Sequence, residues 1–251
     1  MLIKSKYKTT AMIHCGDNYS AFRAVDIEDR DKTEYIINVY ENEAGRHYVE
    51  CYTRLRHCAD FKETFLDGGR LFSVFGLHSG DNIDNIFRKG RKFTWDERVD
   101  YAHNLFHLAL TVSDYPYEFA CAALLSRNMC VVKSNAEDKK IAVNYMASPF
   151  ADAGFEMFIE LLIGQVRKIF PKRYTSCNAE IEFTQLLYSR KTMPTMATTS
   201  MVRLYAEWLS YKKRITAEYE NLYSKKGFDK IMAFAIMNIL RAFKKRSPVK
   251  F

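Results

Sequence analysis

The stretch that decides the fold is KTTAMIHCGDNYSAFRAVDIEDRDKTEYIINVYE, residues 8–41, followed by AGRHYVECYTRLRHC, residues 44–58. The first part contains three runs rich in β-branched and aromatic residues, separated by turn signals at Gly16 and at Asp29. Such runs are typical of short strands. We therefore expect three strands, over residues 8–15, 19–26 and 33–41.

The second part changes its period. Apolar or weakly polar residues recur at helical spacing, namely Tyr48, Cys51, Leu55 and Cys58. This spacing predicts an amphipathic helix over residues 44–58. Two further strands are expected over 61–67 and 70–77, because Gly68-Gly69 between them forms a favourable hairpin turn.

After residue 80 the pattern becomes mainly helical. Thr94 with Glu97 three residues later is a capping-box signature, which predicts a helix over 94–113. A strand pair at 128–134 and 139–146 follows. Further helices are expected over residues 152–169, 178–190, 198–222 and 228–245. The sequence therefore predicts an α+β fold in which strands come first and helices later.

The composition is that of a globular protein of 251 residues, 48% of them hydrophobic, enough for one large core or two joined lobes. No secretory signal precedes the first strand, and no run reaches the about 18 apolar residues that a membrane span needs. The six cysteines are scattered without a CxxC pair. We expect reduced thiols in a cytoplasmic protein, and neither zinc nor another cofactor.

Charge is unevenly distributed along the chain. Residues 1–150 carry 20 Lys and Arg against 21 Asp and Glu, whereas residues 151–251 carry 18 against 9. A basic half of this kind indicates an acidic partner, such as anionic lipid, nucleic acid or an acidic protein surface. The alternative is an ordinary solvated basic surface.

The order of the expected elements resembles the protein-kinase-like fold. Over residues 8–150, five strands around one helix are followed by a helical part that carries a strand pair. The resemblance implies a two-lobed α+β protein, with a small five-stranded lobe over residues 1–77 and a mainly helical lobe over 78–251.

The nucleotide-binding positions of that family are altered here. Of the glycine-rich loop only Gly16 remains, and a plain hairpin turn explains it as well. The third strand carries Asn38 where a kinase has a lysine, so Glu50 on the following helix lacks its cationic partner and reads as a solvated charge. Residues 74–77 resemble the segment between lobes, with Phe75 beside an apolar cleft.

The catalytic positions are altered as well. In CAALLSRNMCV, residues 121–131, Ala123 stands at the position of the catalytic aspartate. Asn128 matches a metal-binding asparagine, although asparagine is equally typical of a turn before a strand. Asn144 replaces the aspartate that binds Mg²⁺, and a neutral amide is a weak ligand for this hard ion. The resemblance thus implies a kinase-like protein without phosphoryl-transfer chemistry.

We therefore expect a catalytically inactive kinase-like (pseudokinase) domain that binds or scaffolds an unknown protein. The alternatives are a basic surface for membranes or nucleic acid and an atypical phosphotransferase. Sequence-specific nucleic-acid binding is not expected, because base-stacking motifs are missing. His103 and His107 have a zinc-compatible spacing but lack the HExxH glutamate, and we interpret them as core or surface histidines.

The C-terminal part contains KIMAFAIMNILR, residues 230–241, which is apolar on nearly every side. A helix of this kind is normally buried, so a core helix is expected. The alternative is docking on an anionic membrane surface, to which the following Lys244, Lys245 and Arg246 would be attracted.

Overall fold

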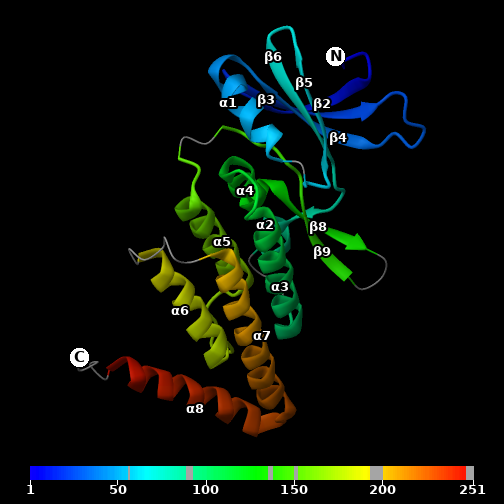
Figure 1. The fold of residues 1–251 in the computed structure, drawn as a ribbon. Helices are drawn as coiled ribbons and strands as arrows, with labels where there is room; N and C mark the ends of the chain where they lie inside the picture. Colours follow the sequence, from blue (N-terminus) through cyan, green and yellow to red (C-terminus); the bar gives the residue numbers. More distant parts are fainter. Residues whose placement is uncertain (56, 89–92, 135–137, 150–151, 193–199, 247–251) are drawn as a thin grey trace. The chain divides into compact units, whose positions relative to one another are not determined.

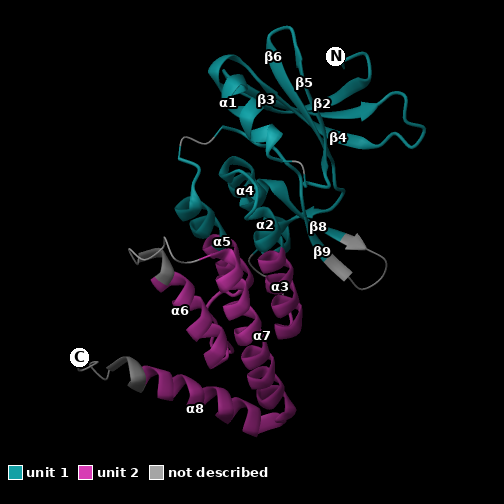
Figure 2. Cartoon of the chain, in the orientation of Figure 1, with its two compact units in different colours: residues 1–91, 108–162 teal, residues 92–107, 163–251 magenta. Residues whose placement is uncertain are grey.

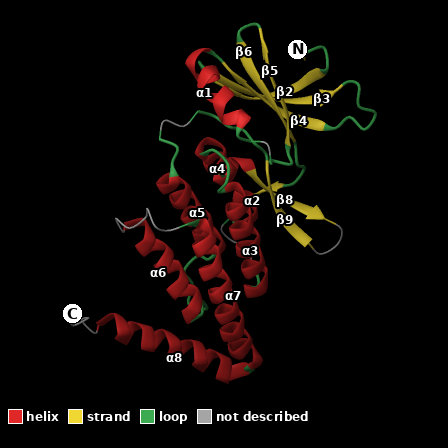
Figure 3. Cartoon of the chain, in the orientation of Figure 1, coloured by secondary structure: helices red, strands yellow, loops and turns green. Residues whose placement is uncertain are grey.

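The computed structural model describes residues 1–55, 57–88, 93–134, 138–149, 152–192 and 200–246 (Figure 1). Two antiparallel sheets and a set of helices make up this part of the chain, so the predicted α+β class is confirmed (Figure 3). The chain divides into two compact units, residues 1–91 with 108–162 and residues 92–107 with 163–251 (Figure 2).

Unit 1 is built on a six-stranded antiparallel sheet in the order β1-β2-β3-β4-β6-β5. Its strands are β1 (Leu2–Ile3), β2 (Tyr7–Cys15), β3 (Tyr19–Asp26), β4 (Glu34–Tyr40), β5 (Phe61–Asp67) and β6 (Arg70–Gly76). The five predicted strands are therefore confirmed, and β1 is added at the edge. Side chains from β4 and β6 form the centre of its core, among them Ile37, Val39, Phe72 and Val74.

The six-stranded sheet is curled. Strands β2 and β5 lie near opposite ends of the strand order, yet the Tyr7 hydroxyl on β2 donates a 2.6 Å hydrogen bond to Glu63 on β5. Lys4, between β1 and β2, lies 2.5 Å from the same carboxylate. Side chains thus connect the two margins of the sheet.

Helix α1 (Asn42–Thr53) packs its Tyr48, Cys51 and Tyr52 side chains inward. The predicted extension of this helix to residue 58 is wrong. After Thr53 the chain continues in tight turns, in which the Leu55 amide donates to the Tyr52 carbonyl. Leu55 is nevertheless buried. All four apolar positions are therefore buried as predicted, and Tyr48 and Cys51 are helical, but Leu55 and Cys58 are not.

The remainder of unit 1 contains a three-stranded sheet and short helices. These elements are β7 (Asp81–Asn82), α2 (Ile83–Ile86), α4 (Tyr117–Leu124), the 3₁₀ turn η1 (Ser126–Asn128), β8 (Met129–Ser134) and β9 (Asp138–Val143). The predicted strand pair is confirmed as β8 and β9, but β9 ends at Val143, so residues 144–146 lie outside the strand. Helix α4 was not predicted, because its apolar run lacks polar residues that would reveal a period.

Helices make up unit 2. Its elements are α6 (Asn178–Thr192), α7 (Met201–Ser224), α8 (Gly227–Arg246) and the larger parts of α3 (Trp95–Val112) and α5 (Phe155–Ile169). The predicted capping box is confirmed, because the Thr94 amide donates to Glu97 at 3.1 Å and the Glu97 amide donates to the Thr94 hydroxyl at 3.4 Å. Trp208 is fully buried and stacks on Phe106, with ring centroids 5.1 Å apart.

The interior of unit 2 also contains an ion pair. Arg98 on α3 lies 3.5 Å from Glu180 on α6, and the Tyr219 hydroxyl on α7 donates a hydrogen bond to the same carboxylate. The Arg98 and Glu180 side chains are only 4% and 2% exposed. Helices α3, α6 and α7 therefore meet at this ion pair. Each of the two charges needs the other, because an unpaired buried charge is strongly unfavourable.

We predict that Glu180→Ala lowers the free energy of unfolding by about 3–5 kcal/mol, because it leaves the Arg98 charge buried and unpaired. Glu182→Ala on the same helix is the control. Glu182 pairs with Arg214 at 2.7 Å, but both side chains are nearly half exposed, and such pairs contribute about 1 kcal/mol or less. Urea unfolding of both variants makes the comparison. Equal losses would contradict a structural role of the buried pair.

Helix α8 contradicts the prediction of a core helix. Phe234 and Met237 are buried, but other large apolar side chains on α8 are between two-fifths and three-quarters exposed, namely Phe228, Ile231, Met232, Ile236, Ile239 and Leu240. The apolar run therefore supplies side chains to two faces of α8, one packed against the protein and one exposed to solvent. None of the helices in the described residues combines the length and apolar character that a bilayer crossing requires.

Candidate functional site

Asn38, which the sequence analysis compared with the kinase lysine, lies in β4 and is fully buried. Its carbonyl oxygen accepts hydrogen bonds from the Tyr19 hydroxyl at 2.7 Å and from the Ala147 amide at 3.1 Å. Its amide nitrogen donates to the Tyr145 carbonyl at 3.0 Å and to the Ser73 hydroxyl at 3.3 Å. These four bonds use the full capacity of the side chain. The amide therefore ties the sheet to the segment that follows β9.

A group of tyrosines extends this network towards α1. The Tyr40 hydroxyl donates to the Ala147 carbonyl at 2.7 Å and lies 2.9 Å from the Tyr52 hydroxyl. The rings of Tyr40 and Tyr48 stack with centroids 4.3 Å apart. Burial raises the pKa of each of these three tyrosines well above its ordinary value. They are therefore neutral hydrogen-bonding groups that fill the space beside Asn38.

Asn144 makes a second polar connection. Its carbonyl oxygen accepts from the His78 backbone amide at 2.8 Å, and its amide nitrogen donates to the His78 carbonyl at 3.1 Å. His78 follows directly on residues 74–77, which the sequence analysis compared with the segment between kinase lobes. The Asn144 side chain, which the sequence analysis compared with a metal ligand, is thus bonded to the backbone directly after that segment.

Phe75 lies in β6 and has no exposed surface. Its ring stacks on that of Tyr145, with centroids 5.0 Å apart, and contacts Phe61 at 5.3 Å. The Phe75 ring itself is therefore covered by aromatic side chains of the protein.

The two remaining interior positions are also buried. Ala123 lies in α4, and Asn128 ends η1 just before β8. The Asn128 amide donates to the Ala122 carbonyl at 2.8 Å and to the Met146 carbonyl at 3.0 Å. These bonds to backbone carbonyls are turn chemistry, the alternative that the sequence analysis gave for this residue.

Glu50 is set apart from the other five positions, because it is exposed on α1 while Tyr48 and Tyr52 point inward. The sequence analysis therefore named four residues that the structure buries in unit 1, a half-buried Asn144, and one residue that lies exposed at the surface. The groups bonded to Asn38 and Asn144 are hydroxyls, a thiol and backbone groups. Such an arrangement of neutral hydrogen-bonding groups can hold segments of the chain together.

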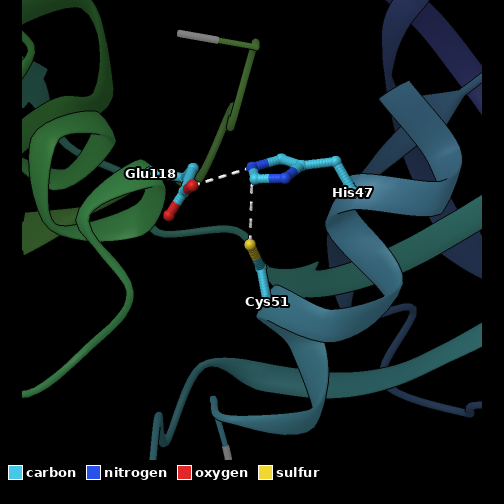
Figure 4. Close-up of side chains that lie close together, drawn as sticks. All are labelled: His47, Cys51 and Glu118. Atoms are coloured by element: carbon cyan, nitrogen blue, oxygen red, sulfur yellow. Dashed lines mark hydrogen bonds and ion pairs between the residues drawn. The ribbon is translucent and has the colours of Figure 1, made fainter. Parts of the chain in front are cut away.

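A different cluster of reactive side chains was missed by the sequence analysis. His47 and Cys51 on α1 lie beside Glu118 on α4 (Figure 4). His47 Nε2 is 2.7 Å from Glu118 Oε1 and 3.8 Å from Cys51 Sγ. Burial and the Glu118 charge raise the pKa of the Cys51 thiol to about 12. The i, i+4 spacing of His47 and Cys51 was the available signal.

Unit 2 contains a hollow of about 830 Å³ at α5, α6 and α8, partly lined by Arg167, Lys172, Arg173 and Arg241. Its basic side chains are partly used within the protein: Arg167 lies over the Tyr188 ring at 4.8 Å, and Arg241 donates to Asn178 at 2.7 Å. The basic residues that line this hollow belong to residues 151–251, in which Lys and Arg outnumber Asp and Glu.

No protein-family model matches this chain, and no curated protein matches it either.

We predict that Asn38→Ala lowers the free energy of unfolding by about 3 kcal/mol or more, because several buried partners lose a hydrogen bond and each costs about 1–3 kcal/mol. Urea unfolding measures the change. Asn18→Ala is the control, since Asn18 is exposed and its side-chain oxygen accepts a bond from the side chain of Asn42, which is also exposed, at 3.1 Å. A loss at Asn38 no larger than that at Asn18 would contradict the role of the buried amide.

Proposed function

We propose that this chain is a non-catalytic, protein-kinase-like module that acts by binding or scaffolding another macromolecule. The observation that carries the proposal is the fully bonded Asn38 amide, at the place where a kinase needs a lysine to meet phosphate. A buried amide whose bonds are all satisfied within the chain has nothing left for a ligand.

Further support comes from the arrangement of the strands and the loop residues. The strand order and the position of α1 between β4 and β5 agree with the small lobe that the resemblance implies. Ala123 and Asn144 are neutral where phosphoryl transfer uses carboxylates, and Tyr145 fills the space beside Phe75. Loss of several charge-stabilising groups together removes many decades of rate.

We predict that millimolar Mg·ATP leaves the melting temperature unchanged. A ligand at 100 times its Kd would add about 2.7 kcal/mol of stability, which corresponds to a rise of about 5 °C or more in a protein of this size. Thermal unfolding with Mg·ATP, with AMP and without nucleotide makes the test. A rise specific to Mg·ATP, or phosphate release that Asn144→Ala abolishes, would favour an atypical phosphotransferase instead.

A second candidate function rests on α8. Its uncovered apolar face includes Ile231 and Leu240, which are 64% and 58% exposed. The half of the chain that contains it carries twice as many basic as acidic residues. Helices with an exposed apolar face and basic surroundings bind at the surface of anionic membranes. We propose that this face of α8 docks on an anionic lipid surface.

Lys244, Lys245 and Arg246 belong to this proposal through the sequence. The backbone of α8 runs to Arg246, but the side chains of these three residues lie outside the described ones. A basic residue close to such a surface contributes about 1 kcal/mol of attraction. Changing all three to Gln should therefore weaken binding by about 100-fold.

We predict that the chain co-sediments with vesicles rich in phosphatidylserine and not with neutral phosphatidylcholine vesicles. Ile239→Asp should abolish this binding, because it places a charge in the apolar face. Val202→Asp is the matched control, since Val202 is 66% exposed on α7 rather than on α8. Equal, negligible binding by the wild type and all variants would reject the membrane surface. Concentration-dependent dimerisation that Ile239→Asp removes would show that a second copy covers the face.

A further inference from the structure

The cluster of His47, Cys51 and Glu118 joins two separate helices of unit 1. His47 and Cys51 lie one turn apart on α1, and Glu118 lies in the first turn of α4. Both contacts end on one atom, His47 Nε2, which is 2.7 Å from the Glu118 carboxylate and 3.8 Å from the Cys51 sulfur. Three donor atoms therefore surround a single point between the helices (Figure 4).

The spacing of these atoms fits a tetrahedral metal ion. All three lie within 4.8 Å of one another. Zinc takes sulfur at about 2.3 Å and nitrogen or oxygen at about 2.0–2.2 Å, so neighbouring ligands stand about 3.3–3.7 Å apart. Replacing the hydrogen bond between His47 and Glu118 by two metal bonds thus needs the two atoms to separate by about 0.6 Å. Small rotations of the side chains provide this movement.

The chemistry of the donors selects the ion. A thiolate and an imidazole are ligands for borderline ions such as Zn²⁺, whereas Mg²⁺ and Ca²⁺ need oxygen donors. The thiolate of Cys51 and the carboxylate of Glu118 would together balance two positive charges. Cys51 is buried and the Glu118 side chain is 17% exposed, while that of His47 is 58% exposed. The point is therefore shielded on one side and open to solvent on the other.

We propose that His47, Cys51 and Glu118 bind a Zn²⁺ ion that links α1 to α4 and keeps one coordination position open to solvent. The ion displaces the proton of the Cys51 thiol and the hydrogen bond between the other two side chains. In this way it fixes α1, which carries Tyr48 and Tyr52 of the interior network, against the helix that contains Ala123. The inference is independent of the function proposed above, since it depends only on the donors.

The test uses the whole chain, reduced with a phosphine and freed of metal by a chelator, and titrated with Co²⁺ as a spectroscopic substitute for Zn²⁺. We expect one Co²⁺ per chain, with a thiolate-to-cobalt charge-transfer band and the visible absorption of tetrahedral cobalt. Zn²⁺ should displace it. Cys51→Ser should remove the charge-transfer band, and Glu118→Gln should weaken binding by at least about 10-fold, the loss typical even of groups that only support a ligand.

Two controls separate this site from adventitious binding. His107→Gln changes an exposed histidine of the other candidate pair, and Cys15→Ser removes the exposed thiol next to His14. Both should bind Co²⁺ like the wild type. If Cys51→Ser does not fold, His47→Gln replaces it, because the exposed His47 side chain can change without a core defect. Wild-type binding by Glu118→Gln and His47→Gln, or loss of binding in Cys15→Ser, would overturn the proposal.

A structural readout accompanies the spectra. Zn²⁺ should slow amide hydrogen exchange in α1 and α4 of the wild type and leave exchange in α7 unchanged, since α7 holds none of the ligands. The same addition to Glu118→Gln should have a much smaller effect. Binding that leaves exchange in α1 unchanged would contradict the link between the two helices.

Discussion

The structure of unit 1 depends on the need to satisfy one buried amide. Asn38 has no access to water, so each of its donors and acceptors must find a partner inside the protein or cost stability. It finds Tyr19 and Ser73 in the sheet and the backbone at Tyr145 and Ala147. The segment after β9 is thereby fixed to the sheet, and the tyrosines pack around that connection. A lysine at this place would need a buried anion, which the bonded groups do not provide.

Because the groups around Asn38 are uncharged and bonded to one another, we propose that binding takes place at the surface. Asn144 engages the backbone of His78 and Tyr145 covers Phe75, so the interior positions are used to hold the chain together. The excess of basic residues was counted over residues 151–251, most of which belong to unit 2. The uncovered face of α8 lies in unit 2 as well. Structural and binding roles are in this view divided between different parts of the sequence, with the cluster at His47 as a third, chemically distinct feature.

Local patterns predicted most elements, and their failures have physical reasons. Runs of β-branched and aromatic residues between turn signals located the strands, and the Thr94–Glu97 box located the start of α3, because both depend on neighbours in sequence. Burial of α8 was predicted wrongly, since an apolar run does not reveal whether another element is available to cover it. The meeting of His47 with Glu118 was invisible because 71 residues separate them along the chain. Asn38 could be singled out through the kinase resemblance, but its bonds to the segment after β9 could not be predicted, since those partners are equally remote along the chain.

The curl of the six-stranded sheet has a consequence for how this protein can meet others. An open sheet presents unpaired backbone groups at both edges, and these are ready templates for an added strand or for aggregation. Here β1 is only two residues long, and Lys4 and Tyr7 connect the β1–β2 margin to Glu63 on β5. A partner that extends the sheet would have to break this connection before it could pair with the backbone. Strand addition at this margin of the six-stranded sheet is therefore disfavoured.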